Sequence, residues 1–176
     1  VLVTNPYNTQ ESSAGSSSGS GAALASNFAI GGTGSDTCQS IRHPSSVSGL
    51  VGIRPSIGVI SRKGIFPLSH IRDTGGPMTR SVRDSALMLT AMASIDPVDD
   101  PDTTLFKAED RPDTYLRFLD RDTHGVKGKK IGVLRQLGTS TTPAGTGEQG
   151  ALIAQAVAKM REMGAEVYEV LLPSFQ

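Results

Sequence analysis

The fold class follows from the stretch GEQGALIAQAVAKMREMGAEVYEVL, residues 147–171, read together with the apolar run KIGVL at 130–134. The longer stretch predicts a helix over residues 148–163 that ends at Gly164, because glycine commonly follows the last turn of a helix. The β-branched and aromatic residues of 165–171 predict a strand, as does the apolar run before the helix. This alternation of strand, helix and strand indicates an α/β protein with at least some parallel strands.

A second clear helix is predicted at residues 81–94, SVRDSALMLTAMAS. Its apolar side chains recur at spacings of four, three and four, which places them on one helical face: Val82, Ala86, Leu89 and Ala93. Ser81 is expected to cap the N-terminus, and Asp84 lies near the helix start, where a carboxylate is favourable.

The remaining elements are predicted to be short. We expect a strand at 1–4, a loop at 5–14, an alanine-rich helix at 20–29, a short buried segment over 29–37, a helix within 40–50, two extended pieces within 51–61, and a polar loop at 138–147. The run DPVDDPDTT, residues 96–104, holds two prolines and four aspartates and is predicted to be a solvated connector.

Composition excludes several classes of function. Lysine plus arginine and aspartate plus glutamate both number 17, so no net charge attracts nucleic acid or an anionic membrane. No apolar run approaches the ~20 residues of a membrane helix. The single cysteine, Cys38, excludes an internal disulfide and favours a reducing compartment such as the cytoplasm.

The glycine–serine run GSSSGSG, residues 15–21, has several interpretations. A flexible linker should join two self-sufficient cores, but only a few residues precede this run. Ser17 is central in a G-x-S-x-G match, yet the polar residues before it do not suit the buried strand of a nucleophile elbow. A dinucleotide loop would need a third glycine where Leu24 stands.

Metal chemistry has little support in the sequence. No pair of histidines has the spacing of metal ligands, since the three histidines lie far apart: His43, His70 and His124. Ordinary hydrogen bonding or surface exposure is the expected role of each. A serine–histidine triad stays open on sequence distance alone, but no particular histidine is indicated.

Several motifs occur in order along the chain and together resemble the amidase signature family, which hydrolyses carbon–nitrogen amide bonds. They are GSSSGS at 15–20, GSDTCQSIRHP at 34–44, GLVGIRPS at 49–56, DTGGPMTRSVRD at 73–84, GKKIGVLR at 128–135 and MGAEVYEVLLP at 163–173. The resemblance implies an α/β fold with a mixed β-sheet layered between α-helices. It also implies a small-molecule or peptide amide as substrate, and no metal or organic cofactor.

The resemblance places the nucleophile at Ser40 and a bridging serine at Ser16, twenty-four positions earlier. In the family the bridging serine follows a cis peptide bond, expected here at Gly15–Ser16. A serine hydroxyl is a weak nucleophile without a base, and in the family a neutral lysine takes the proton through the bridging serine. Keeping a lysine neutral requires a pKa lowered by burial or by nearby positive charge.

The same resemblance implies an oxyanion hole made of four consecutive backbone N–H groups, those of Thr37, Cys38, Gln39 and Ser40. Asp36 and Arg42 are expected to brace this loop as an ion pair or hydrogen-bonded set. Ser17 is expected either to support the site by hydrogen bonds or simply to be solvated. The Cys38 side chain is expected to be a small packed residue without a catalytic role.

The chain departs from the family pattern at two places. None of its lysines, the first being Lys63, matches the position of the triad lysine, which lies upstream of the glycine–serine loop in the family. We therefore expect an internal fragment of one domain: 1–95 as the catalytic signature core, 96–128 as a connector and 129–176 as a strand–helix–strand portion. Gln39 replaces a glycine, and it would be strained or obstructive if that position needs positive φ or close substrate approach.

The expected function is amide hydrolysis through a serine acyl-enzyme, incomplete in this fragment. One alternative is an A-type subunit of a glutamyl-tRNA amidotransferase, which needs partner subunits and would be the one case that involves nucleic acid. Another is a non-catalytic relative or binding module, which the glutamine at position 39 favours. The sequence leaves the oligomeric state open.

Overall fold

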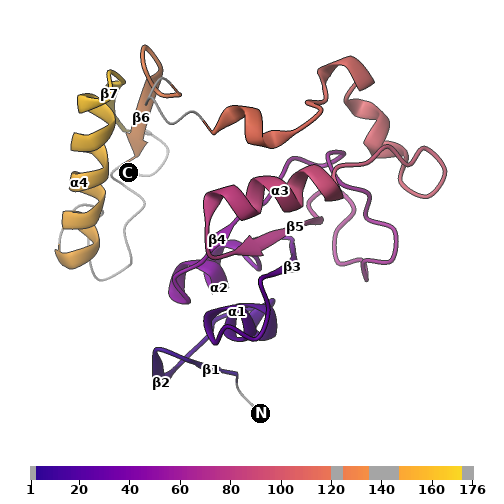
Figure 1. Ribbon diagram of the computed structural model, residues 1–176, viewed down its shortest axis with the longest axis horizontal. Coiled ribbons are helices and arrows are strands. Elements are labelled where there is room, and N and C mark those ends of the chain that lie inside the picture. The colour runs from indigo at the N-terminus through magenta and orange to yellow at the C-terminus, as the bar shows by residue number, and fades with distance from the viewer. Residues whose placement is uncertain (1–2, 120–124, 135–146, 172–176) are drawn as a thin grey trace. The chain divides into compact units, whose positions relative to one another are not determined.

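The computed structural model describes residues 3–119, 125–134 and 147–171 (Figure 1). The chain forms two compact units, Val1–Arg117 and Phe118–Gln176, and each is described by itself. The strand predicted at 1–4 overlaps the described residues only at its end, where β1 begins at Thr4. The loop predicted at 138–147 lies outside the described residues, apart from Gly147, which begins a helix.

An antiparallel sheet of three strands forms the centre of the first unit. Its strands are β3 (Gly31–Asp36), β5 (Thr74–Thr79) and β4 (Val51–Gly52), in the order β3–β5–β4. The register of β3 on β5 runs from Gly31 opposite Thr79 to Asp36 opposite Thr74. Every residue of β5 is buried, as expected for the central strand of the sheet.

The central strand β5 was not predicted, because its sequence TGGPMT carries glycine and proline signals typical of turns. Pro77 lies opposite Thr33, and its carbonyl accepts a hydrogen bond from the N–H of Ile53 at 3.0 Å. Glycine is required beside it, since a Cβ atom on Gly76 would lie 2.0 Å from the carbonyl oxygen of Ile53. Close backbone approach therefore explains a strand that propensity alone disfavours.

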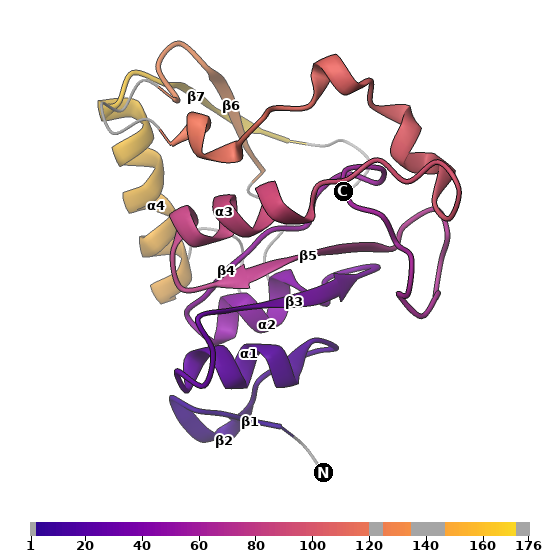
Figure 2. The same cartoon turned by 45° about the vertical axis from the view of Figure 1, so that its right-hand side comes forward.

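Helices cover both faces of this sheet (Figure 2). Helices α1 (Ser18–Ala25) and α2 (Arg42–Val47) lie on one face, and α3 (Val82–Met92) lies on the other. One cluster of buried side chains in the core consists of Leu24, Ile41 and Met78, with Leu50 packed against it. The helix predicted at 20–29 is confirmed in kind, although it begins at Ser18 and ends at Ala25.

Helix α3 forms at the predicted place. The Ser81 hydroxyl accepts a hydrogen bond from the backbone N–H of Asp84 at 3.1 Å, which confirms the predicted N-cap. Ala86 and Leu89 are buried as the periodicity predicted, whereas Val82 is 56% exposed. The apolar face was therefore assigned one turn too far toward the N-terminus.

The polar segment 5–14 is a β-hairpin, so the loop predicted there is wrong. Strand β1 (Thr4–Asn5) pairs antiparallel with β2 (Asn8–Ser12). The Asn5 side chain accepts a hydrogen bond from the N–H of Tyr7 at 2.9 Å and donates one to the carbonyl of Val47 at 2.7 Å. Every residue of β2 is exposed, which is why its sequence lacks the apolar alternation that signals a strand.

The acidic segment 96–104, predicted to be a solvated connector, is exposed at most of its residues but is anchored by two buried ones. Asp100 is buried, and its carboxylate accepts hydrogen bonds from the Arg62 guanidinium at 2.5 and 2.8 Å. Thr103 is also buried and accepts a hydrogen bond from the N–H of Asp96 at 2.8 Å. Pairing with Arg62 offsets the cost of burying the carboxylate. The short 3-10 helix η1 (Pro101–Leu105) begins within this segment, and η2 (Ala108–Asp110) and η3 (Tyr115–Phe118) follow it.

The second unit confirms the predicted strand, helix and strand. Strands β6 (Lys130–Leu134) and β7 (Glu166–Val170) pair in parallel, and α4 (Gly147–Glu162) connects them in sequence. Gly164 has φ of 89°, the left-handed conformation that glycine adopts after the end of a helix.

Helices layered on a sheet, with antiparallel pairs in one unit and a parallel pair in the other, give the α/β class that was predicted. Within the described residues, no helix combines the length and apolar character that crossing a membrane requires.

Candidate active site

The β3–α2 loop, defined here as residues 37–40, connects the edge of the sheet to helix α2. Asp36 ends β3 and is fully buried. Its carboxylate oxygen Oδ2 accepts hydrogen bonds from the backbone N–H groups of Ile41 at 3.1 Å and Arg42 at 3.4 Å. A carboxylate at the start of a helix satisfies N–H groups that have no partner within the helix. Asp36 therefore fixes where the loop ends.

Two arginines flank the buried carboxylate. The Nε atom of Arg42 lies 3.2 Å from Oδ2 of Asp36, and the Nε atom of Arg54 lies 3.3 Å from Oδ1. Burial raises the pKa of Asp36, but the hydrogen bonds from the Arg42 side chain and from the two N–H groups outweigh burial and lower this pKa below its usual value. The predicted contact between Asp36 and Arg42 is thus present, and Arg54 is an addition that sequence reasoning missed.

Arg42 also reaches into the loop itself. One of its Nη atoms donates a hydrogen bond to the backbone carbonyl of Cys38. The side chain therefore connects the buried Asp36 to the middle of the β3–α2 loop and restricts the path of its backbone.

A second carboxylate holds the other end of the loop. The Thr37 hydroxyl donates a hydrogen bond to Oδ1 of Asp73 at 2.5 Å, and Oδ2 accepts from the N–H groups of Leu68 and Ser69 at 2.7 Å each. Asp73 is 5% exposed. The hydrogen bond from Thr37, aided by those two N–H groups, lowers the pKa of Asp73 below its usual value. Sequence reasoning did not single out this residue, although it begins the motif at 73–84.

Among the described residues, the backbone N–H groups of the β3–α2 loop lack the hydrogen-bond partners that some of its carbonyl groups have. No described residue accepts a hydrogen bond from the N–H of any of the four loop residues. The carbonyls of Gln39 and Ser40 both have partners, since they accept from the N–H groups of His43 at 2.8 Å and Ser17 at 3.2 Å. Four consecutive N–H donors are thus left available to a ligand or to solvent.

The glycine–serine loop lies against Ser40. The peptide bond between Gly15 and Ser16 is cis, as the family resemblance predicted. The next residue, Ser17, donates its N–H to the Ser40 carbonyl at 3.2 Å, which joins the two loops directly. The Ser17 hydroxyl donates to the Ser35 carbonyl at 3.4 Å. Ser16 is exposed and Ser40 is half-buried.

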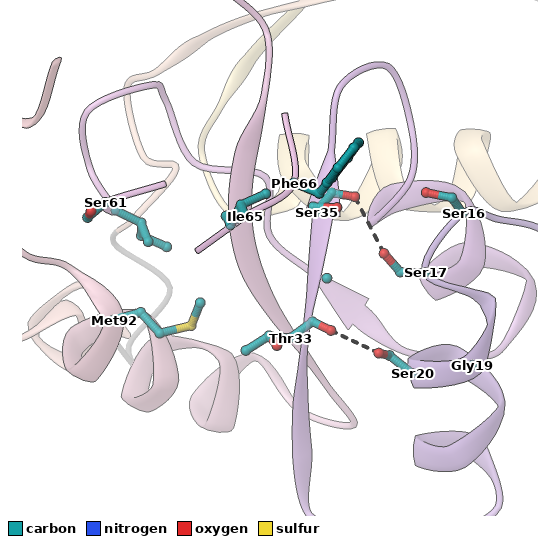
Figure 3. Close-up of a pocket in the computed structure, with 13 residues that line it drawn as sticks. Ser16, Ser17, Gly19, Ser20, Thr33, Ser35, Ser61, Ile65, Phe66 and Met92 are labelled. Carbon is teal, nitrogen blue, oxygen red and sulfur yellow. Dashed lines mark hydrogen bonds between the residues drawn. The ribbon is translucent and has the colours of Figure 1, made fainter. Parts of the chain in front are cut away.

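A hollow of about 620 Å³ opens beside the glycine–serine loop (Figure 3). Hydroxyl side chains and apolar side chains both line it, and no charged side chain does: Ser16, Ser17, Ser20, Thr33, Ser35, Ser61, Ile60, Ile65, Phe66 and Met92, together with three glycines. Ser16 is therefore open to a space that accommodates a small ligand, whereas Ser40 lies outside this lining.

Gln39 does not have the backbone conformation that would strain it. Among the described residues other than glycine, φ is positive only at Ala14 and Asn27. Backbone strain at Gln39 is therefore ruled out as the consequence of replacing a glycine there. The side chain is exposed, so the remaining hypothesis is that it obstructs the approach of substrate.

Cys38 is an exposed free thiol, so the prediction that its side chain is packed is wrong. The Cys38 carbonyl, rather than its thiol, accepts a hydrogen bond, which comes from the Arg42 side chain. In the part of the chain that the structure describes, no three histidine, cysteine or acidic side chains are placed to hold a metal ion. His124 lies outside the described residues.

The amidase family model matches residues 2–176 of the chain. The A-type subunit of glutamyl-tRNA(Gln) amidotransferase from a Synechococcus species is 40% identical, over 99% of this chain and 32% of its own length. Native peptide amidase from Stenotrophomonas maltophilia is 38% identical with a TM-score of 0.83, over 97% of this chain and 33% of its own.

The corresponding amidotransferase subunit from Thermotoga maritima is 29% identical with a TM-score of 0.78, over 97% of this chain and 35% of its own. This chain thus spans about a third of the length of these relatives. The family model matches nearly all of the chain. The chain therefore belongs to the amidase family, the group of amidase signature enzymes.

Proposed function

We propose that the complete protein carrying this chain hydrolyses amide bonds through an acyl-enzyme on Ser40. The Ser40 hydroxyl oxygen attacks the amide carbonyl carbon, the carbon–nitrogen bond breaks, and the amine leaves with a proton. Water then hydrolyses the resulting ester and releases the carboxylic acid. The observation that supports this most strongly is the β3–α2 loop, whose N–H groups find no acceptor among the described residues beside the proposed nucleophile.

The N–H groups of residues 37–40 would stabilise the negative oxygen of the tetrahedral intermediate. Removing one such donor in a protease costs about 10²- to 10³-fold in kcat. A loop held at both ends by buried carboxylates suits this role, because donors that are already positioned need no rearrangement during the reaction.

Ser16 would relay the Ser40 proton to a neutral lysine. The hydrogen bond from the N–H of Ser17 to the carbonyl of Ser40 supports this assignment, since it brings the residue after Ser16 against the nucleophile. The lysine has no counterpart at the matching position of this chain, and we propose that another part of the complete protein supplies it. Asp36, Arg42 and Ser17 would support the site without touching substrate.

A fluorophosphonate probe tests the nucleophile, because it forms a covalent bond only with an activated serine. We expect intact-protein and peptide mass spectrometry of the complete protein to show one adduct, located on Ser40. The adduct should disappear in Ser40→Ala and persist in the matched control Ser46→Ala, which removes an exposed serine of α2. Absence of labelling on Ser40 would instead favour a non-catalytic relative or binding module.

An amidotransferase A-type subunit is the second candidate, because a curated relative at 40% identity carries that name. Such a subunit releases ammonia from an amide donor and passes it to an activated glutamyl-tRNA, together with partner subunits. Stable co-purification with partner subunits and glutamine-dependent ammonia release would favour this candidate. Turnover of simple or peptide amides by the protein alone would favour the amidase, in line with the structural similarity to a peptide amidase.

A further inference from the structure

We propose that Asp73 is a positioning residue for the reaction, because its carboxylate holds Thr37, the first residue of the β3–α2 loop, against the central strand β5. This inference rests on the proposed function and deepens it, since it names what fixes the geometry of the four N–H donors. Asp73 does not contact a reacting atom and acts by positioning Thr37.

The sheet register explains why these two residues meet. The pairing of β3 with β5 ends where Asp36 lies opposite Thr74. One position further in the same register, Thr37 lies opposite Asp73, just past the end of the paired strands. There the hydrogen bond of 2.5 Å from the Thr37 hydroxyl to Asp73 replaces the backbone pairing. The contact thus extends the order of the sheet into the loop.

Asp73 is itself held firmly. Its second carboxylate oxygen accepts two backbone hydrogen bonds, from Leu68 and Ser69, and the residue is buried. All three donors favour the ionised form, so the carboxylate can accept from Thr37 without a proton of its own. A buried acceptor fixed by two backbone groups is a rigid anchor for a third donor.

The anchor matters because the opposite end of the loop is already fixed. Asp36 holds the N–H groups of Ile41 and Arg42, and Arg42 holds the Cys38 carbonyl. If Thr37 were released, the first N–H donor of the loop would be free to move relative to the others. Misplacing a catalytic group by about 1 Å can cost about 10²-fold in rate.

Thr37→Val is the most direct test, because valine keeps the shape of threonine and removes only the hydroxyl. Thr37→Ser keeps the hydroxyl and serves as the rescue variant. Thr104→Val is the matched control, since the Thr104 hydroxyl donates to the Pro101 carbonyl at 2.8 Å outside the proposed site. All are measured in the complete protein, after Ser40-dependent turnover of a simple amide has been established with Ser40→Ala.

We expect kcat to fall about 10- to 100-fold in Thr37→Val, with KM close to that of Thr104→Val. The thermal midpoint should also fall, because the variant removes one of the three donors to the buried carboxylate of Asp73. Thr37→Ser should recover most of the loss in kcat. A purely structural role would lower only the thermal midpoint, and kcat of the folded variant would stay close to that of wild type.

A kcat in Thr37→Val within twofold of wild type would overturn the inference and leave the proposed function standing. A loss that Thr37→Ser shares in full would also overturn it. Absence of Ser40-dependent turnover in the wild-type protein would overturn the proposed function, and the inference with it. If Thr37→Val does not fold, Thr37→Ala decides by the same criteria.

Discussion

At the scale of single residues, the proposed chemistry depends on a few side chains around one short loop. Asp36 and Asp73 hold its ends, and Ser17 joins it to the glycine–serine loop. Family resemblance in the sequence was enough to expect Ser40, Ser16 and the Asp36–Arg42 contact. Arg54 and Asp73 were missed, because their partners lie 18 and 36 residues away and only the folded sheet brings them together.

Replacing Gln39 by a smaller residue is expected to increase activity. Its exposed side chain is proposed to obstruct substrate, so Gln39→Gly should raise kcat/KM of the complete protein. Because φ at Gln39 is not positive, a glycine backbone is unnecessary, and Gln39→Ala should give most of the same gain. Steady-state kinetics on one simple amide decide this. Unchanged or lower kcat/KM in both variants would reject the obstruction hypothesis.

Asp36→Asn should lower stability. It weakens a buried set of charged hydrogen bonds, each worth about 1.5–3 kcal/mol. The folded-state pKa of Asp36 is lower than its unfolded value of about 3.9. The stabilisation is therefore fully present above that unfolded value and is lost as the pH falls through the folded-state pKa. Urea unfolding of both proteins as a function of pH measures the difference.

The gap between wild type and Asp36→Asn should be largest near neutral pH and should shrink in acid. A gap that stays constant between neutral pH and pH of about 3 would show that ionisation of Asp36 does not contribute.

At the scale of elements, the sequence predicted a helix or strand correctly where its apolar residues recur on one face or where its residues have a clear helix or strand propensity. The second unit and helix α3 were predicted for that reason. Strand β5 was missed because all of its residues are buried by segments that are distant in sequence, so the local sequence carries no signal for it. The hairpin of β1 and β2 was missed because its exposed residues carry no apolar signal. The buried anchor of the acidic segment at Asp100 was missed because its partner, Arg62, is distant in sequence.

Gly76→Ala should disrupt the central strand. An added Cβ would lie 2.0 Å from the Ile53 carbonyl oxygen, a backbone atom that cannot rotate away. The free energy of unfolding should fall by about 3 kcal/mol or more, at or above the upper end of ordinary overpacking. Gly125→Ala is the matched control, since nothing lies within 4 Å of its added Cβ. Equal thermal midpoints for the two variants would contradict the assigned backbone contact.

At the scale of the whole molecule, the chain spans about a third of the length of its relatives, and we propose that it carries part of the active site. None of its lysines matches the family position of the base, so residues 1–176 expressed alone should show little or no Ser40-dependent turnover. Ammonia or amine release from a simple amide measures this, with Ser40→Ala as the background. Turnover by residues 1–176 above that background would show that the base lies within this chain.

Trapping the acyl-enzyme tests directly whether Ser40 is the nucleophile. The complete protein is mixed with an amide substrate, quenched in acid during turnover, and mapped by peptide mass spectrometry. We expect the acyl group of the substrate to be attached to Ser40, and we expect Ser40→Ala to carry no adduct and to have no turnover. An acyl group on another residue, or turnover that persists in Ser40→Ala, would contradict it.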